Sequence, residues 1–222
     1  VKTRAIDDVP MLGLTLWSES YSDYQLSQMA QELETEIKKV NDVSITHKIG
    51  GRNRQLRVVL DKDKLASSGL DFLSVSQMIK ASNTQLRSGS FDTNDTEFLV
   101  NTGKFLSSVA DVENLVVGVQ QNQPIYLKQI ATIIDGPEVP QNYVSIGFGQ
   151  ASDKSQTYKS EYPAVTISIA KRKGADAMKI AEVVLDRVHH LRKTLIPDDV
   201  QIEITRNYGE TASHKVSELL LH

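Results

Sequence analysis

The chain has 222 residues, of which 40% are hydrophobic, and a formal net charge of −3 at pH 7. This length corresponds to one large domain or two small ones, each able to bury a core. The near-balance of charge argues against the broad basic surface of a nucleic-acid-binding protein. Cysteine is absent, which excludes disulfide bonds, thiolate catalysis and cysteine-ligated metal centres. No stretch approaches the roughly 20 apolar residues of a membrane-spanning helix.

A strand followed by an amphipathic helix is the first strong pattern. Residues 9–17 carry leucine at every second position, which is the period of a strand. The sequence Ser22-x-x-Gln25 is typical of a helix N-terminus with a capping box. Apolar residues then recur at helical spacing over residues 26–40. The pattern predicts a helix with one buried face.

A second strand and a second β-α-β pattern follow. Residues 43–49 alternate apolar and polar side chains and are predicted to form the strand that completes the first unit. Far along the chain, residues 164–170 alternate in the same way. A helical stripe covers residues 176–193, and a last alternating strand covers residues 200–205. The sequence therefore contains two separate β-α-β halves.

The two halves are predicted to complete each other as one split β-α-β, or ferredoxin-like, sandwich of the α+β class. Four strands would then turn their aliphatic side chains onto two helices. The predicted core places Leu14, Ile45, Ile167 and Ile202 beneath Leu33 and Val184. The opposite, largely polar face of the sheet is predicted to carry Met11, Thr15, Trp17, Thr46, Lys48, Thr166, Ser168 and Thr205.

The segment between the halves is predicted to be an inserted α+β domain. It spans residues 54–139 and alternates short strands with short helices, so residues 1–53 and 140–209 form the flanking domain. Its apolar runs are short, which predicts a thinner core. Residues 150–160 have no apolar pattern and are predicted to form a mobile hairpin or loop.

Motifs for catalysis or metal binding are not evident in this sequence. His189 and His190 are adjacent on a helix, about 100° apart, and cannot chelate one metal together. The other histidines have no partner at a recognised metal spacing. A nucleophile elbow and a Walker-type loop are also missing. We therefore expect no enzyme activity, no metal and no cofactor.

Three local patterns together resemble one family. KRKGADA at residues 171–177 resembles the K-x-x-G-A-N-A turn of resistance–nodulation–division (RND) efflux transporters of the AcrB/D/F type. IYLKQIATI at residues 125–133 resembles their I-x-L-[K/R]-D-[I/V]-A-x-[I/V] segment. RVVLD at residues 57–61, with Leu65 and Leu70 after it, resembles the start of their docking subdomain. The order and spacing match, and the resemblance covers nearly the whole chain.

The resemblance implies a periplasmic loop of a proton-driven inner-membrane pump. Residues 1–53 and 140–209 would be a porter subdomain, and residues 54–139 an inserted docking subdomain. Residues 210–222 would form a helix leading to a transmembrane segment. The implied partners are amphiphilic small-molecule substrates, the rest of the pump trimer, a periplasmic adaptor and an outer-membrane channel, with no nucleic acid. Hydrophobic-drug exporters carry aromatic residues at places that here hold residues 8–11 and 48–50.

Two functional hypotheses remain open at this point. In the first, the polar sheet face lines the substrate path of the pump through Met11, Thr15, Trp17, Thr46, Lys48, Thr166 and Ser168. In the second, the chain is an assembly module whose exposed face packs only against other subunits. The family's trimer contacts lie mainly outside this segment, so we expect the isolated chain to be a monomer at micromolar concentration.

Overall fold

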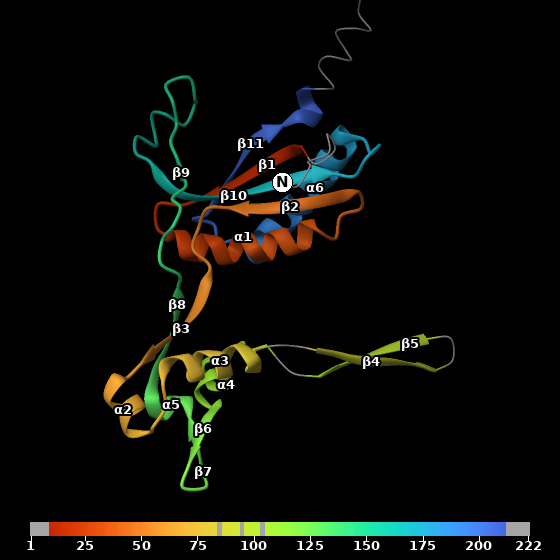
Figure 1. Cartoon of the computed structure of the whole chain (residues 1–222). Helices are drawn as coiled ribbons and strands as arrows, with labels where there is room; N and C mark the ends of the chain where they lie inside the picture. The colour runs from red at the N-terminus through yellow and green to blue at the C-terminus, as the bar shows by residue number, and fades with distance from the viewer. Residues whose placement is uncertain (1–8, 84–85, 94–95, 103–104, 212–222) are drawn as a thin grey trace, which may run out of the picture. The chain divides into compact units, whose positions relative to one another are not determined.

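The structure, a computed structural model, describes residues 9–83, 86–93, 96–102 and 105–211 (Figure 1). The chain divides into two compact units. One is built from the residues up to Asn53 and from Pro137 onward, and the other is Arg54–Gly136. The chain thus returns to the first unit at Pro137. The sequence pattern had predicted this return three residues later, at residue 140. No helix in the described ranges is long and apolar enough to cross a membrane.

The first unit is an antiparallel sheet covered on one face by two helices. Its elements are β1 (Pro10–Trp17), α1 (Asp23–Ile37), β2 (Val43–Ile49), β9 (Ser145–Ile146), β10 (Tyr162–Lys171), α6 (Ala177–Leu195) and β11 (Gln201–Asn207). The main strands lie in the order β11-β1-β10-β2, and β9 pairs with the start of β10. This order confirms the predicted split β-α-β sandwich.

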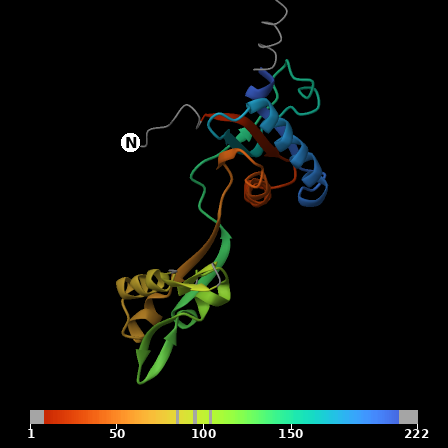
Figure 2. The ribbon, with the colours of Figure 1, turned by 90° about the vertical axis from the view of Figure 1, so that its right-hand side faces the viewer.

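Helices α1 and α6 lie side by side on the same face of this sheet, as Figure 2 shows when compared with Figure 1. The predicted capping box starts α1, because the Ser22 hydroxyl accepts from the Gln25 amide while the Gln25 side chain accepts from the Ser22 amide. At the start of α6, the Asp176 side chain accepts hydrogen bonds from the amides of Met178 and Lys179. Both helices therefore begin where the sequence places their polar start signals.

The core lies between the sheet and these helices. Leu14, Ile167, Leu33 and Val184 are completely buried in one cluster, as predicted, and Ile202 packs against its edge. Ile45 is the exception, with 39% of its surface exposed. We call the covered side of the sheet the helix face and the opposite side the outer face.

A bulge in β2 explains why the prediction for Ile45 is wrong. Thr46 pairs with Ile169 and Val43 pairs with Lys171, so β2 uses three residues where β10 uses two. One extra residue reverses the alternation of side chains beyond it. Val43 and Thr46 are consequently both buried, and Ile45 turns away from the helices.

The second unit has its own smaller core. Its elements are β3 (Arg54–Leu60), α2 (Lys62–Ser67), α3 (Phe72–Ser82), β4 (Leu86–Thr93), β5 (Thr96–Thr102), α4 (Val109–Glu113), β6 (Val116–Gln120), β7 (Gln123–Tyr126), α5 (Leu127–Ile130) and β8 (Ala131–Pro137). The strands pair as β3-β8, β4-β5 and β6-β7. Val75, Leu127 and Ile130 are the most buried members of the core.

The two ends of the first unit that flank this insert are hydrogen-bonded to each other. The backbone amide of Glu138 donates to the carbonyl of Asn53 over 2.9 Å. The Glu138 carboxylate accepts from the Asn53 backbone amide at 2.9 Å and from its side-chain amide at 2.8 Å. The chain can therefore leave and re-enter the first unit at one point.

We predict that Ile167→Ala lowers the free energy of unfolding by about 2–5 kcal/mol, because it leaves a cavity in a completely buried site. Ile45→Ala is the matched control and should cost much less, since Ile45 is partly exposed. Denaturant unfolding of the purified chain measures both. A loss below about half a kcal/mol for Ile167→Ala contradicts the shared core.

Replacing Arg54–Gly136 by a short Gly/Ser linker should leave the first unit folded, because Asn53 and Glu138 already meet. Circular dichroism and a cooperative thermal transition of the shortened chain would check this. An unfolded product beside a folded parent chain would show that the first unit depends on the insert.

Candidate functional site

The middle of the outer face is a row of hydroxyl groups across three strands. The Thr15 hydroxyl on β1 lies 2.8 Å from the Thr166 hydroxyl on β10 and 3.1 Å from the Thr205 hydroxyl on β11. Ser168 follows Thr166 on the same side of β10 and is 9% exposed. Thr205 also donates to the carbonyl of Gly13 over 3.3 Å. A side chain at Gly13 would stand only 3.1 Å from the Thr205 hydroxyl, so glycine permits this close approach.

Four aromatic rings gather at one end of this face. Trp17, the last residue of β1, is only 1% exposed. Its ring centroid lies 4.7 Å from Tyr158, 5.1 Å from Tyr162 and 5.2 Å from Phe148. Phe148 and Tyr158 belong to the segment that precedes β10, and Tyr162 begins that strand. We call these four residues the aromatic cluster.

The segment that contributes Phe148 and Tyr158 was predicted to be a hairpin or loop, and it is a series of turns. The amide of Ser152 donates to the carbonyl of Gly149 at 2.9 Å, and that of Tyr158 donates to Lys154 at the same distance. These turns bring both rings back onto Trp17. The polar composition of residues 150–160 therefore conceals a folded segment that covers the end of β1.

A carboxylate lies next to the aromatic cluster. Glu203 on β11 pairs across from Thr15, and therefore faces the same side of the sheet. It accepts a hydrogen bond from the Trp17 indole nitrogen at 3.3 Å and forms an ion pair with Lys154. Lys154 also lies over the Phe148 ring, 5.8 Å from its centroid. Rings, carboxylate and lysine thus form one continuous polar–aromatic surface.

The predicted placement of Thr46 and Lys48 on this face is wrong. Because of the bulge in β2, both side chains point to the helix face. The Thr46 hydroxyl donates to Glu34 of α1 over 2.6 Å. The Lys48 ammonium donates to Ser27 of the same helix over 2.7 Å.

Met11 does not line the outer face either. It is 3% exposed and belongs to the core cluster of the first unit. A register shift in β1 between Pro10 and Leu12 accounts for this position. Of the seven candidate residues, Thr15, Trp17, Thr166 and Ser168 thus share the outer face, with Trp17 covered by the aromatic cluster.

Sequence reasoning missed Phe148, Tyr158, Tyr162, Lys154 and Glu203 as members of this site. Their positions depend on turns in a segment without periodicity. One signal was available, because three aromatic residues within a short polar stretch are unusual for a solvated loop.

Burial raises the pKa of the Tyr162 phenol, and a hydrogen bond with Glu19 adds to this shift.

The polar groups on the helix face form a network of their own. Burial of Glu34 opposes its ionisation, but hydrogen bonds from Thr46 and Lys38 and the charges of Lys38 and Lys48 outweigh it, so its pKa is lowered. Burial also lowers the pKa of Lys48, although Glu34 and Glu138 partly offset this. Lys48 donates further to the Asn53 side chain at 3.0 Å. The network therefore ties α1 to the residues where the chain leaves the first unit.

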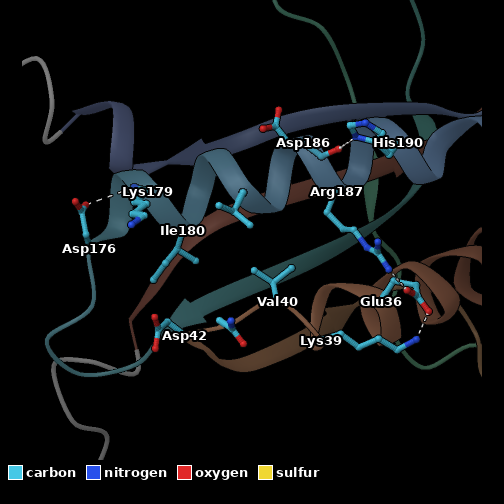
Figure 3. A pocket seen from close by; sticks show the side chains of 12 residues that line it. Glu36, Lys39, Val40, Asp42, Asp176, Lys179, Ile180, Asp186, Arg187 and His190 are labelled. Carbon is cyan, nitrogen blue, oxygen red and sulfur yellow. Dashed lines mark hydrogen bonds and ion pairs between the residues drawn. The ribbon is translucent and has the colours of Figure 1, made fainter.

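A groove of about 900 Å³ lies between the end of α1 and α6, on the side of the helices (Figure 3). Charged side chains at the α1 end of the groove pair with one another, since Arg187 donates to Glu36 over 2.6 Å and Lys39 also pairs with Glu36. The His190 ring contacts the carbonyl of Asp186 at 2.7 Å. Within the described ranges, no three His, Asp or Glu side chains come together as a metal site.

The first unit is thus an α+β sandwich of split β-α-β type, and the second unit is inserted between its halves. The family model described as "AcrB/AcrD/AcrF family" matches residues 2–220, and the chain belongs to that family. The resemblance seen in the three sequence motifs is therefore confirmed.

The curated relatives are named as resistance and efflux proteins. The chain is 28% identical over 217 residues to "Multidrug resistance protein MdtC" of Erwinia amylovora, covering 96% of this chain and 19% of that protein. It is 24% identical over 189 residues to "Cation efflux system protein CusA" of Escherichia coli K12, covering 84% of this chain and 17% of that protein. It is also 23% identical to "Putative cation efflux system protein SilA" of Salmonella typhimurium over 188 residues, with the same two coverages. The chain thus spans about a fifth of the length of these relatives.

We predict a pH-dependent loss of stability for Glu34→Gln. A lowered pKa in the folded state means that ionised Glu34 stabilises the fold above its ordinary pKa of 4.5, and that this contribution is lost as the pH falls through the folded-state pKa. The variant should therefore be less stable than the parent chain at neutral pH, and the difference should shrink at about pH 3.

Denaturant unfolding of both chains at the two pH values checks this prediction. Glu32→Gln, an exposed position on the same helix, is the matched control and should change little at either pH. An equal difference at both pH values would show that Glu34 acts by its shape and not by its charge.

Proposed function

We propose that this chain forms the periplasmic porter and docking part of a proton-driven RND efflux pump, and that its outer face lines part of the substrate path. The observation that carries this is the outer face itself, which combines the hydroxyl row with the aromatic cluster and which no helix of the described residues covers. Family membership supplies the context, because the named relatives are resistance and efflux proteins.

The chemistry of the outer face fits amphiphilic small molecules. The hydroxyls of half-buried Thr166 and exposed Thr205 can donate to or accept from the polar part of such a molecule. Thr15 is buried beneath them and bonds to both hydroxyls. Ile49 of β2 also lies on the outer face, and 50% of its surface is exposed, so it can contact the apolar part of the molecule. Pockets for small molecules commonly combine apolar walls with a few polar groups in this way.

The two units would take different roles in the pump. The first unit would be the porter subdomain, and Arg54–Gly136 would be the docking subdomain directed towards an outer-membrane channel. The remaining partners would be the other protomers of a trimer and a periplasmic adaptor. Residues 208–211 are helical, and the helix proposed to lead into the membrane lies largely in residues 212–222, outside the described residues. The chain would act in transport and not as an enzyme.

An assembly module is the second candidate, and the exposed apolar residues of β2 favour it. Ile45 is 39% exposed and Ile49 is 50% exposed, and both lie on the outer face. Apolar side chains on a sheet also mark surfaces that pack against a neighbouring subunit. In that case the outer face would contact protein and no substrate.

We predict that disruption of the gene that encodes this chain raises the accumulation of a fluorescent amphiphilic dye in its host cell. Complementation with Thr205→Trp should fail to restore export, because an indole on this exposed position fills the space above the hydroxyl row. Thr194→Trp is the matched control, since Thr194 is an exposed threonine at the end of α6 on the other side of the sheet.

The same cells separate the two candidates. Chemical cross-linking should recover the trimer of Thr205→Trp in the amount found for the parent protein, if the outer face contacts substrate. Loss of the trimer together with export would favour the assembly module. Unchanged dye accumulation after disruption of the gene contradicts the transport function altogether.

A further inference from the structure

The aromatic cluster and Glu203 have the composition of a site for an organic cation. Trp17 is the centre of four rings, with the three neighbouring centroids within 5.2 Å. Aromatic faces attract ammonium groups through their quadrupoles, and an adjacent carboxylate adds a charge. Glu203 supplies that carboxylate and is oriented by the Trp17 indole nitrogen at 3.3 Å. Neither the hydroxyl row nor family membership requires such an arrangement.

The protein's own Lys154 ammonium already lies beside Glu203 and the Phe148 ring. Lys154 forms an ion pair with Glu203 and lies over the Phe148 ring, 5.8 Å from its centroid. These are the two contacts that an organic cation would make. Lys154 comes from the same turn segment as Phe148 and Tyr158, so this segment provides both part of the walls and the occupant.

The occupant can leave without opening the core. The side chains of Lys154 and Glu203 are 42% and 22% exposed, so their ion pair lies at the border with solvent. Phe148 and Tyr158 are half-buried, whereas Trp17 beneath them is covered. A ligand that replaces the Lys154 ammonium would therefore meet the rings and the carboxylate from the solvent side.

We infer that the aromatic cluster and Glu203 form a binding site for an alkyl- or arylammonium cation, and that Lys154 is a tethered competitor that must be displaced. A tethered group competes at an effective concentration on the order of millimolar, so it raises the ligand concentration needed for binding. Removing the charge of Lys154 should increase the apparent affinity for the cation, because the ligand then no longer has to displace the lysine ammonium from the site.

Titration of the purified chain with benzyltrimethylammonium tests this inference. Trp17 is the only tryptophan, so its fluorescence reports the site directly. We expect saturable quenching by the cation and none by benzyl alcohol, a neutral molecule with the same ring. Lys154→Met keeps the length of the side chain without its charge and should bind the cation about two- to fivefold more tightly, as expected for loss of a partly exposed ion pair. Lys154→Arg, which keeps the charge, is the matched control and should behave like the parent chain.

Two variants test the walls and the charge of the site. Glu203→Gln should weaken binding of the cation about two- to fivefold, as expected for loss of a partly exposed ion pair. Phe148→Leu should also weaken binding, and it changes no strand residue, because Phe148 lies in the turn segment. The inference is overturned if the cation gives no saturable quenching, if benzyl alcohol quenches equally, or if Lys154→Met does not bind more tightly. It is also overturned if the folded Glu203→Gln or Phe148→Leu chain binds like the parent.

This inference goes beyond the proposed transport function and can fail separately from it. The titration uses the purified chain, whereas the dye assay uses cells. Absent binding with unchanged export in cells would remove only the cation site. Binding without any export would leave the site in place and remove the transport function.

Discussion

The pairing of β1 with strands on both sides is the constraint on which the rest of the first unit depends. β1 is hydrogen-bonded to β10 and to β11, and its residues from Met11 to Trp17 are all buried. Its leucines form the centre of the helix-side core, whereas Thr15 and Trp17 lie beneath the polar and aromatic groups of the other side. One strand thus fixes the core and the candidate site together, so a register slip in β1 would exchange the two faces.

Most of the fold could be predicted because it depends on local periodicity. The alternating strands and the amphipathic helices α1 and α6 appear where their patterns indicated, and handedness and pairing rules leave few ways to assemble two β-α-β halves. The face of β2 could not be predicted, because a bulge adds one residue near Ser44 and reverses the alternation after it. One residue of α1 gave a partial signal for the face of β2. Glu34 follows the buried Ala30 by one helical turn, so it also faces the sheet and needs a polar partner there, such as Thr46.

The candidate site was less predictable than the fold for a physical reason. The hydroxyl row follows from strand alternation, so Thr15, Thr166 and Ser168 were placed correctly on the outer face. The aromatic cluster follows from turns whose hydrogen bonds have no sequence period, and it joins residues as distant as Trp17, Tyr158 and Glu203. Residues 8–11 and 48–50, where the resemblance to hydrophobic-drug exporters would place aromatic side chains, hold none in this chain, whereas the turn segment supplies Phe148 and Tyr158 at another position.

Protection of a single cysteine by substrate tests the central claim most directly, that the outer face contacts the exported molecule. The chain has no cysteine of its own, so Thr205→Cys places one reactive thiol on the outer face and Thr194→Cys places one beside the helices. The account predicts that an exported amphiphile slows alkylation of the first thiol and leaves the second unchanged. Equal alkylation rates with and without the amphiphile at both positions, in cells that export it, would contradict the account.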